Sequence, residues 1–157
     1  MSSIVRIVIA GGDRGIAKSL REVLSVTPEV TVVGEARSGR EAIASAGRLE
    51  PDILLLDIDL SGSCGLDILP LITWWSPCVK VIIVSGHSDE ATIVEALALG
   101  ARGYIMKGDE TSVIKAIRAV QCGEVWARRR VAARVLAQLV GLAIGTFQGV
   151  QGEPVTT

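Results

Sequence analysis

Hydrophobic residues along the chain form short runs of Ile, Val and Leu that alternate with longer stretches in which apolar positions recur every three or four residues. The short β-branched runs predict strands, and the longer spacing predicts amphipathic helices. Strands that alternate with helices in this way are typical of right-handed βαβ units on a parallel sheet. The pattern therefore predicts an α/β, doubly wound fold with a five-stranded parallel sheet. The expected strands span 4–10, 30–35, 52–57, 79–85 and 102–107, and the expected helices span 13–26, 38–50, 66–74, 88–99 and 109–122.

Two of the expected helices carry additional local signals. In 13–26 the apolar positions fall on one face, which predicts packing of that face against the sheet. Ser38 precedes Glu41 by three residues, and this spacing predicts a capping box at the start of the second helix.

The pattern changes after Gly123, where one more helix is predicted, followed by a linker. The helix, 124–147, is apolar on more than one face, so another surface has to cover it. We expect it to pack against the same helix of a second chain in a symmetric homodimer, with fold-back onto its own domain as the alternative. Its apolar positions are Val131, Val135, Leu139 and Leu142 in one stripe, with Leu136, Val140 and Ile144 beside it.

Composition narrows the class of protein. The 157 residues carry a net charge of −1, so no overall field attracts nucleic acid or an anionic membrane. The "RRR" run at 128–130 is interpreted as a solvated helix face. Three cysteines without a CxxC pair favour a reducing compartment, and no stretch resembles a signal peptide or membrane span. These features predict a cytoplasmic protein.

Polar residues follow several of the expected strands. Gly11, Gly12 and Asp13 follow the first strand, Asp57 ends the third, Ser85 ends the fourth, and Lys107 follows the fifth. Since the carboxyl ends of parallel strands meet at one edge, these groups are expected to converge. A carboxylate could accept a phosphoryl group there, while a hydroxyl and an ammonium bind its oxygens.

The glycine-rich turn also allows a second interpretation, a nucleotide-binding P-loop. The segment 12–19 fits the Walker A pattern except that Ala17 replaces the second glycine. Lys18 falls on the polar side of the expected helix. We therefore keep a P-loop-like nucleotide site only as an alternative.

Several motifs in register resemble the receiver domains of two-component response regulators over about residues 4–123. That family implies the strand order 2-1-3-4-5, a receiver domain at 1–123, a possible dimerisation helix at 124–147, and a linker at 148–157 toward a DNA-binding domain outside this chain. The stretches "VVGEARSGREAI" and "ALGARGYIMK" resemble the LuxR/NarL-type subgroup. The motifs that carry the family resemblance are "LLLDIDLSG", "VIIVSGH" and "GYIMKGD".

The resemblance implies a role for each matching residue. Asp57 is the phosphoacceptor position, and Lys107 pairs with the phosphoryl group. Ser85 is the switch hydroxyl, and Tyr104 is the aromatic switch residue. Asp59 supplies a backbone carbonyl to the metal.

The chain departs from the family where two acidic residues normally hold Mg²⁺, because Gly11 and Gly12 stand there. A carboxylate near 4 Å from the metal ion contributes a Coulomb attraction of about 4 kcal/mol at an effective dielectric near 20, and each missing carboxylate removes that contribution. Asp57, Asp59 and Asp13 are the residual metal candidates, and Asp13 is better explained as a helix N-cap. We therefore expect no cofactor here, with Mg²⁺ binding weak or absent.

The resulting functional hypothesis is a non-enzymatic receiver module in phosphorelay signalling that regulates transcription through an attached helix-turn-helix domain. A sensor histidine kinase is the implied partner, and DNA contact would occur only through a domain outside this chain. The alternative within the same fold is a phosphorylation-independent ligand-binding or dimerisation module.

Overall fold

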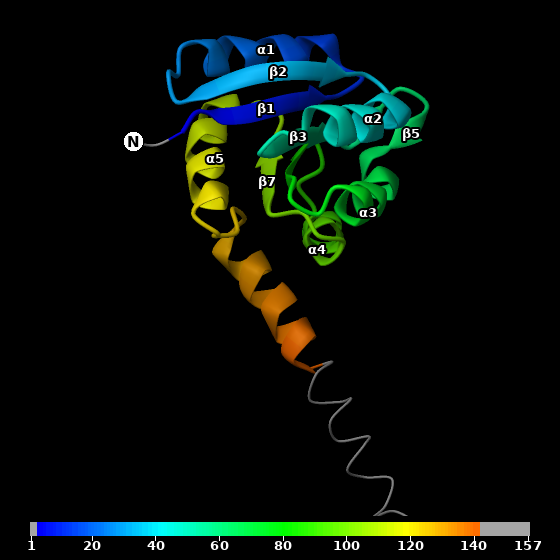
Figure 1. Ribbon diagram of the computed structural model, residues 1–157. Coiled ribbons are helices and arrows are strands. Elements are labelled where there is room, and N and C mark those ends of the chain that lie inside the picture. Colours follow the sequence, from blue (N-terminus) through cyan, green and yellow to red (C-terminus); the bar gives the residue numbers. More distant parts are fainter. Residues whose placement is uncertain (1–2, 142–157) are drawn as a thin grey trace, which may run out of the picture.

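The computed structural model describes residues 3–141 and contains the predicted sheet (Figure 1). All five of its strands run parallel, in the order β2-β1-β3-β6-β7. Counted along the chain, this is the order 2-1-3-4-5, so the predicted fold class is confirmed. The strands are β1 (Val5–Ala10), β2 (Val30–Ala36), β3 (Ile53–Asp57), β6 (Lys80–Ser85) and β7 (Gly103–Met106).

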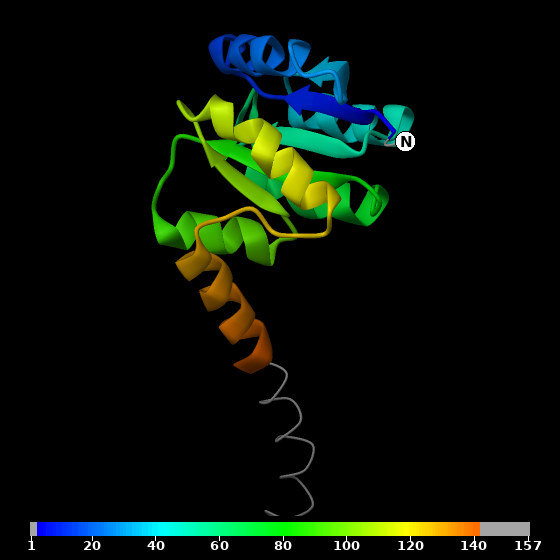
Figure 2. The same ribbon diagram turned by 90° about the vertical axis from the view of Figure 1, so that its left-hand side faces the viewer.

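Helices cover both faces of the sheet, and α5 lies across one of them (Figure 2). One hydrophobic cluster joins that face to α1 and α5, and a second joins the other face to α2, α3 and α4. Every residue of β3 is buried between these layers, as expected for a central strand of a parallel sheet. The helices are α1 (Arg14–Ser25), α2 (Gly39–Leu49), α3 (Gly65–Trp75), α4 (Glu90–Ala98) and α5 (Val113–Gln121), with a 3₁₀ turn η1 (Glu110–Ser112) before α5.

Helix starts follow the local capping chemistry. Asp13 Oδ1 accepts hydrogen bonds from the backbone N–H groups of Gly15 and Ile16 and so caps α1. At α2, Ser38 Oγ accepts from the N–H of Glu41, which was the predicted cap. The helix predicted from residue 88 begins at Glu90, because Asp89 serves as its N-cap.

Two segments differ from the sequence prediction. The expected loop after β3 contains a short antiparallel pair, β4 (Asp59–Leu60) and β5 (Ser63–Cys64). The last helix starts at 129 instead of 124, because the preceding residues run beside β7. There Trp126 N donates to the carbonyl of Arg102, and Tyr104 N donates to the carbonyl of Trp126. This long-range pairing holds the segment extended.

The helix that begins at 129 starts beside α4 and extends away from the sheet (Figures 1 and 2). Val131 is buried in the cluster of α2, α3 and α4, so the first turns fold back on their own domain. Arg130, interpreted above as part of a solvated helix face, is 85% exposed and pairs with Glu90, as does Arg134. Leu142, Ile144 and the predicted linker 148–157 lie outside the described residues. Within 3–141 no helix has both the length and the apolar character needed to cross a membrane.

Candidate functional site

The polar residues at the strand ends meet at the carboxyl edge of the sheet. Asp57 is the last residue of β3, with β1 on one side and β6 on the other. Its side chain is 3% exposed. Lys107, directly after β7, reaches back over β6 and places its Nζ 3.1 Å from Asp57 Oδ1 and 3.2 Å from Asp59 Oδ2. The sheet therefore assembles a carboxylate and an ammonium predicted from separate motifs.

The two oxygens of Asp57 differ in their surroundings. Oδ1 accepts from the backbone N–H of Asp59 at 2.9 Å and pairs with Lys107. Oδ2 is buried and has no hydrogen-bond partner among the described residues. Burial raises the pKa of Asp57 above its usual 3.8, and the N–H of Asp59 and the Lys107 charge offset only part of this. Burial opposes the charge on Lys107 too, but the nearby carboxylates outweigh it and raise the pKa of that lysine.

The side chains of Ser85 and Tyr104 form hydrogen bonds with the loop after β6, and no hydrogen bond joins either of them to Asp57 among the described residues. Ser85 is fully buried, and its Oγ accepts from the N–H of His87 at 2.9 Å. The Tyr104 hydroxyl donates to the carbonyl of His87 at 2.7 Å, with the ring buried. Burial is the main cause that raises the pKa of Tyr104. The backbone of His87 therefore links the two predicted switch residues.

The two glycines after β1 lie tightly against this edge. Gly11 N donates to Ala36 O at 2.9 Å, and Gly12 N donates to Asp59 O at 3.1 Å. A Cβ on Gly11 would lie 3.1 Å from Asp57 Cβ, and one on Gly12 would lie 3.1 Å from Asp59 O. The turn thus occupies the space beside Asp57 with backbone, and side chains there would have to displace their neighbours.

This arrangement does not suit a Mg²⁺ ion. Mg²⁺ requires near-octahedral oxygen ligands, and the turn supplies no carboxylate. The carbonyl of Asp59 already accepts the Gly12 N–H, and Asp13 is engaged in capping α1. Across residues 3–141, no three His, Cys, Asp or Glu side chains are grouped to hold a metal. The residues present do not fit the metal that the family resemblance implies.

The geometry also disfavours a P-loop. In such a loop the backbone N–H groups of the turn cradle the phosphates. Here those of Gly11 and Gly12 donate to backbone carbonyls, and those of Gly15 and Ile16 donate to Asp13. Lys18 is exposed on α1.

Comparison with known proteins decides the family, since the family model for the response regulator receiver domain matches residues 7–118. The chain belongs to that family. The receiver is 36% identical over 121 residues to the transcriptional regulatory protein LnrK of Bacillus subtilis, covering 76% of this chain and 55% of LnrK. It is 35% identical over 107 residues to the nitrate/nitrite response regulator NarL of Escherichia coli K12, covering 68% of this chain and 50% of NarL.

A solved structure supports the same assignment. The LuxR-family two-component response regulator from Aurantimonas sp. SI85-9A1 superposes with a TM-score of 0.77 at 26% identity, covering 88% of this chain and 99% of that one. These relatives place the receiver in the LuxR/NarL type. The chain spans about half the length of the two curated relatives.

Sequence patterns located the side chains of this receiver's edge but not the backbone groups around them. Asp57, Asp59 and Lys107 come together, whereas Ser85 and Tyr104 contact His87. The single histidine, His87, carries no sequence signal for this role, because its contacts use main-chain atoms. The hydrogen bond from Gly12 to Asp59 likewise depends on how the β1–α1 turn approaches the β3–β4 connection.

We predict that Asp57→Asn stabilises the receiver at neutral pH by about 1 kcal/mol, because it removes a buried carboxylate with one unpartnered oxygen. Lys107 keeps Asp59 as an ion-pair partner, so no cation is left unpaired. The measurement is the free energy of unfolding in urea for both proteins at about pH 7.

The pH dependence supplies the control. Because the pKa of Asp57 is raised on folding, the folded state binds more protons in the window just above 3.8. The contribution of Asp57 to the free energy of unfolding therefore falls as pH rises through that window, and the difference from Asp57→Asn reaches its full size above the folded pKa of Asp57. The stability difference should shrink toward about pH 4. A less stable Asn variant at neutral pH would mean that the Lys107 pair outweighs the burial of the charge.

Proposed function

We propose that this receiver is a signalling switch of a two-component transcription regulator, acting through an attached helix-turn-helix domain and not as an enzyme with turnover. The names of LnrK and of the LuxR-family structure support the regulatory role. The part of each relative that the chain does not cover leaves room for such a domain. The free thiols of Cys64, Cys78 and Cys122 suit a switch that works in the reducing cytoplasm.

Within this switch, Asp57 is the phosphoacceptor position, Lys107 the phosphate-pairing residue, and Ser85 and Tyr104 the switch residues. A sensor histidine kinase is the family's source of the phosphoryl group. We further propose that Mg²⁺-dependent phosphorylation is weak in this receiver. The observation that carries this part is that Gly11 and Gly12 place only backbone beside Asp57 and Asp59, so the turn offers no carboxylate oxygen to a metal.

Intact mass after incubation with Mg²⁺ and acetyl phosphate tests the proposal. We expect the unmodified receiver to gain no phosphoryl group in the time that labels a receiver with both acidic residues, because phosphoryl transfer depends on charge neutralisation by the metal. Asp57→Asn is the matched control for labelling elsewhere. Uptake of one group that disappears in Asp57→Asn would contradict weak phosphorylation and make the receiver an ordinary phospho-switch.

We also propose that the helix starting at 129 forms a homodimer contact. Beyond the buried Val131, this helix exposes Leu136, Leu139 and Val140 at 62%, 56% and 48%. A cavity of about 310 Å³ lies between the helix and the end of α4, with Leu97 and Val135 in its walls. Since the helix extends away from the sheet (Figure 1), a second copy can pack along it.

Leu136→Glu with Leu139→Glu is expected to shift a dimer to a monomer, because the paired apolar surfaces would each bury two charges. The control for an added surface carboxylate is Val26→Glu, which adds one such charge at a position 81% exposed just after α1. Light scattering coupled to size exclusion measures the mass of each. A dimer that persists in the double variant would assign the contact to another surface.

A further inference from the structure

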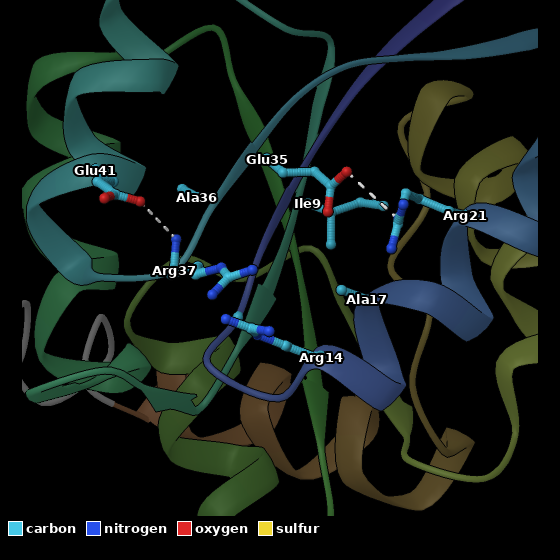
Figure 3. Close-up of a pocket in the computed structure, with 9 residues that line it drawn as sticks. Ile9, Arg14, Ala17, Arg21, Glu35, Ala36, Arg37 and Glu41 are labelled. Atoms are coloured by element: carbon cyan, nitrogen blue, oxygen red, sulfur yellow. Dashed lines mark hydrogen bonds and ion pairs between the residues drawn. The ribbon is translucent and has the colours of Figure 1, made fainter.

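A second cavity lies beside the β1–α1 turn, and Asp57 is not among its lining residues (Figure 3). It has a volume of about 520 Å³ and lies among the ends of β1 and β2, the first turns of α1 and the start of α2. Three arginines line it, Arg14, Arg21 and Arg37, together with two glutamates. We propose that this cavity binds a phosphate-bearing small molecule, with the phosphate held between Arg14 and Arg37.

Charge pairing leaves two of the three arginines available. Arg21 pairs with Glu35 at 3.4 Å. The carboxylate of Glu41 accepts from the backbone N–H of Arg37 at 2.8 Å, which ties it to the start of α2 and away from the guanidinium. Within residues 3–141 the guanidinium groups of Arg14 and Arg37 have no hydrogen-bond or ion-pair partner in the protein.

The two unpaired groups also face one another. Figure 3 shows the Arg14 side chain from α1 and the Arg37 side chain from the β2–α2 connection extending into the same space. Like charges that converge without a carboxylate between them repel, so an anion placed there would relieve the repulsion. Three arginines against two glutamates leave the cavity net positive.

The chemistry of these groups selects phosphate. A guanidinium presents planar, paired N–H donors that match two phosphate oxygens, and two such groups on separate elements can hold one phosphate from two sides. In the first turn of α1, the N–H groups of Gly15 and Ile16 already donate to Asp13. Recognition therefore rests on the arginine side chains.

The size of the cavity suggests more than a free anion. Its volume falls in the range of small-molecule sites, which is about 300–1,000 Å³. Ile9, Ala17 and Ala36 give it an apolar wall beside the arginines. A phosphate monoester with a nucleoside-sized organic group would contact both the arginines and the apolar wall.

The position links such a ligand to the receiver's edge. Gly11 lines the cavity, and a Cβ built on it would lie 3.1 Å from Asp57 Cβ. Occupancy would therefore act next to Asp57 without any phosphoryl transfer to it. The proposal does not depend on whether Asp57 is phosphorylated.

Isothermal titration calorimetry with adenosine 5′-monophosphate, inorganic phosphate and adenosine tests the site. We expect saturable binding of both phosphate-bearing probes, with adenosine far weaker. Arg14→Gln and Arg37→Gln should each weaken binding about tenfold, as expected for loss of charge-assisted hydrogen bonds. Both residues are exposed, so the variants should fold, and thermal unfolding verifies this. Tighter binding of the nucleotide than of phosphate would indicate a nucleotide-sized ligand, and equal binding would indicate the free anion.

Two lysine variants distinguish this cavity from other phosphate sites. Lys18→Gln removes a charge from the exposed face of α1 outside the cavity and should leave binding unchanged. Loss of binding with Lys18→Gln would instead point to a P-loop, and loss with Lys107→Gln would place the phosphate at Asp57. Binding that is unaffected by Arg14→Gln and Arg37→Gln would overturn the proposal. The proposal would also be wrong if neither phosphate nor the nucleotide saturates the receiver at about millimolar concentration.

Discussion

The double substitution Gly11→Asp with Gly12→Asp is expected to speed Mg²⁺-dependent uptake of a phosphoryl group by this receiver at least about a hundredfold. A new carboxylate about 4 Å from the ion contributes about 4 kcal/mol per unit of ion charge at an effective dielectric near 20. Recovering about 3 kcal/mol of this attraction in the transition state gives that factor. The pocket already supplies Asp57 and Lys107 in contact. The time course of intact mass with acetyl phosphate measures the rate.

Sterics must be separated from charge in this experiment. A Cβ at Gly11 or Gly12 lies 3.1 Å from its nearest neighbour, so both substitutions push the turn outward by a few tenths of an ångström. The pair Gly11→Asn and Gly12→Asn has the same bulk without the charge and is the matched control. Equal uptake by the Asn and Asp pairs would contradict the role of the missing carboxylates. If Gly11→Asp with Gly12→Asp does not raise the rate of phosphoryl uptake, the pocket lacks more than its metal ligands.

Gly65→Ala is expected to lower the free energy of unfolding by about 3 kcal/mol, because the added methyl group meets backbone atoms and cannot be accommodated by side-chain rotation. Gly65 is the first residue of α3, and its N–H donates to the carbonyl of Ile58 at 2.7 Å. A Cβ there would lie 2.5 Å from Asp57 O and 2.9 Å from Ile58 Cα. The start of α3 or the end of β3 must move, and urea unfolding measures the cost.

Gly47→Ala provides the comparison. Gly47 lies inside α2, and a Cβ there would meet no atom within 4 Å. Alanine at an unobstructed helical position should stabilise by about 0.5–1 kcal/mol, because it restricts the unfolded chain. Both substitutions replace glycine by alanine, yet the free energy of unfolding should fall for Gly65→Ala and rise for Gly47→Ala. A small effect of Gly65→Ala would mean that the β3–α3 connection adjusts more easily than its backbone contacts suggest.

Local patterns alone predicted the sheet and several of its details. The apolar run at 53–56 is buried, and the strand ends carry Asp57 and Lys107 to one edge. Asp13 and the Ser38–Glu41 spacing predicted helix caps that the structure contains. These signals are readable because strand burial, helical periodicity and capping depend on residues within about four positions of one another.

Contacts between distant segments decided the rest. The bond from Gly12 to Asp59 and the pairing of Trp126 with β7 join parts of the chain that no local periodicity relates. Arg14 and Arg37 carry no joint signal, yet neighbouring ends of β1 and β2 bring them to one cavity. The sequence by itself thus determined the receiver fold and the acidic residue at its edge. The tertiary structure decided how the glycine turn closes on that residue, because backbone hydrogen bonds and convergent charges depend on positions in space that residue type does not encode.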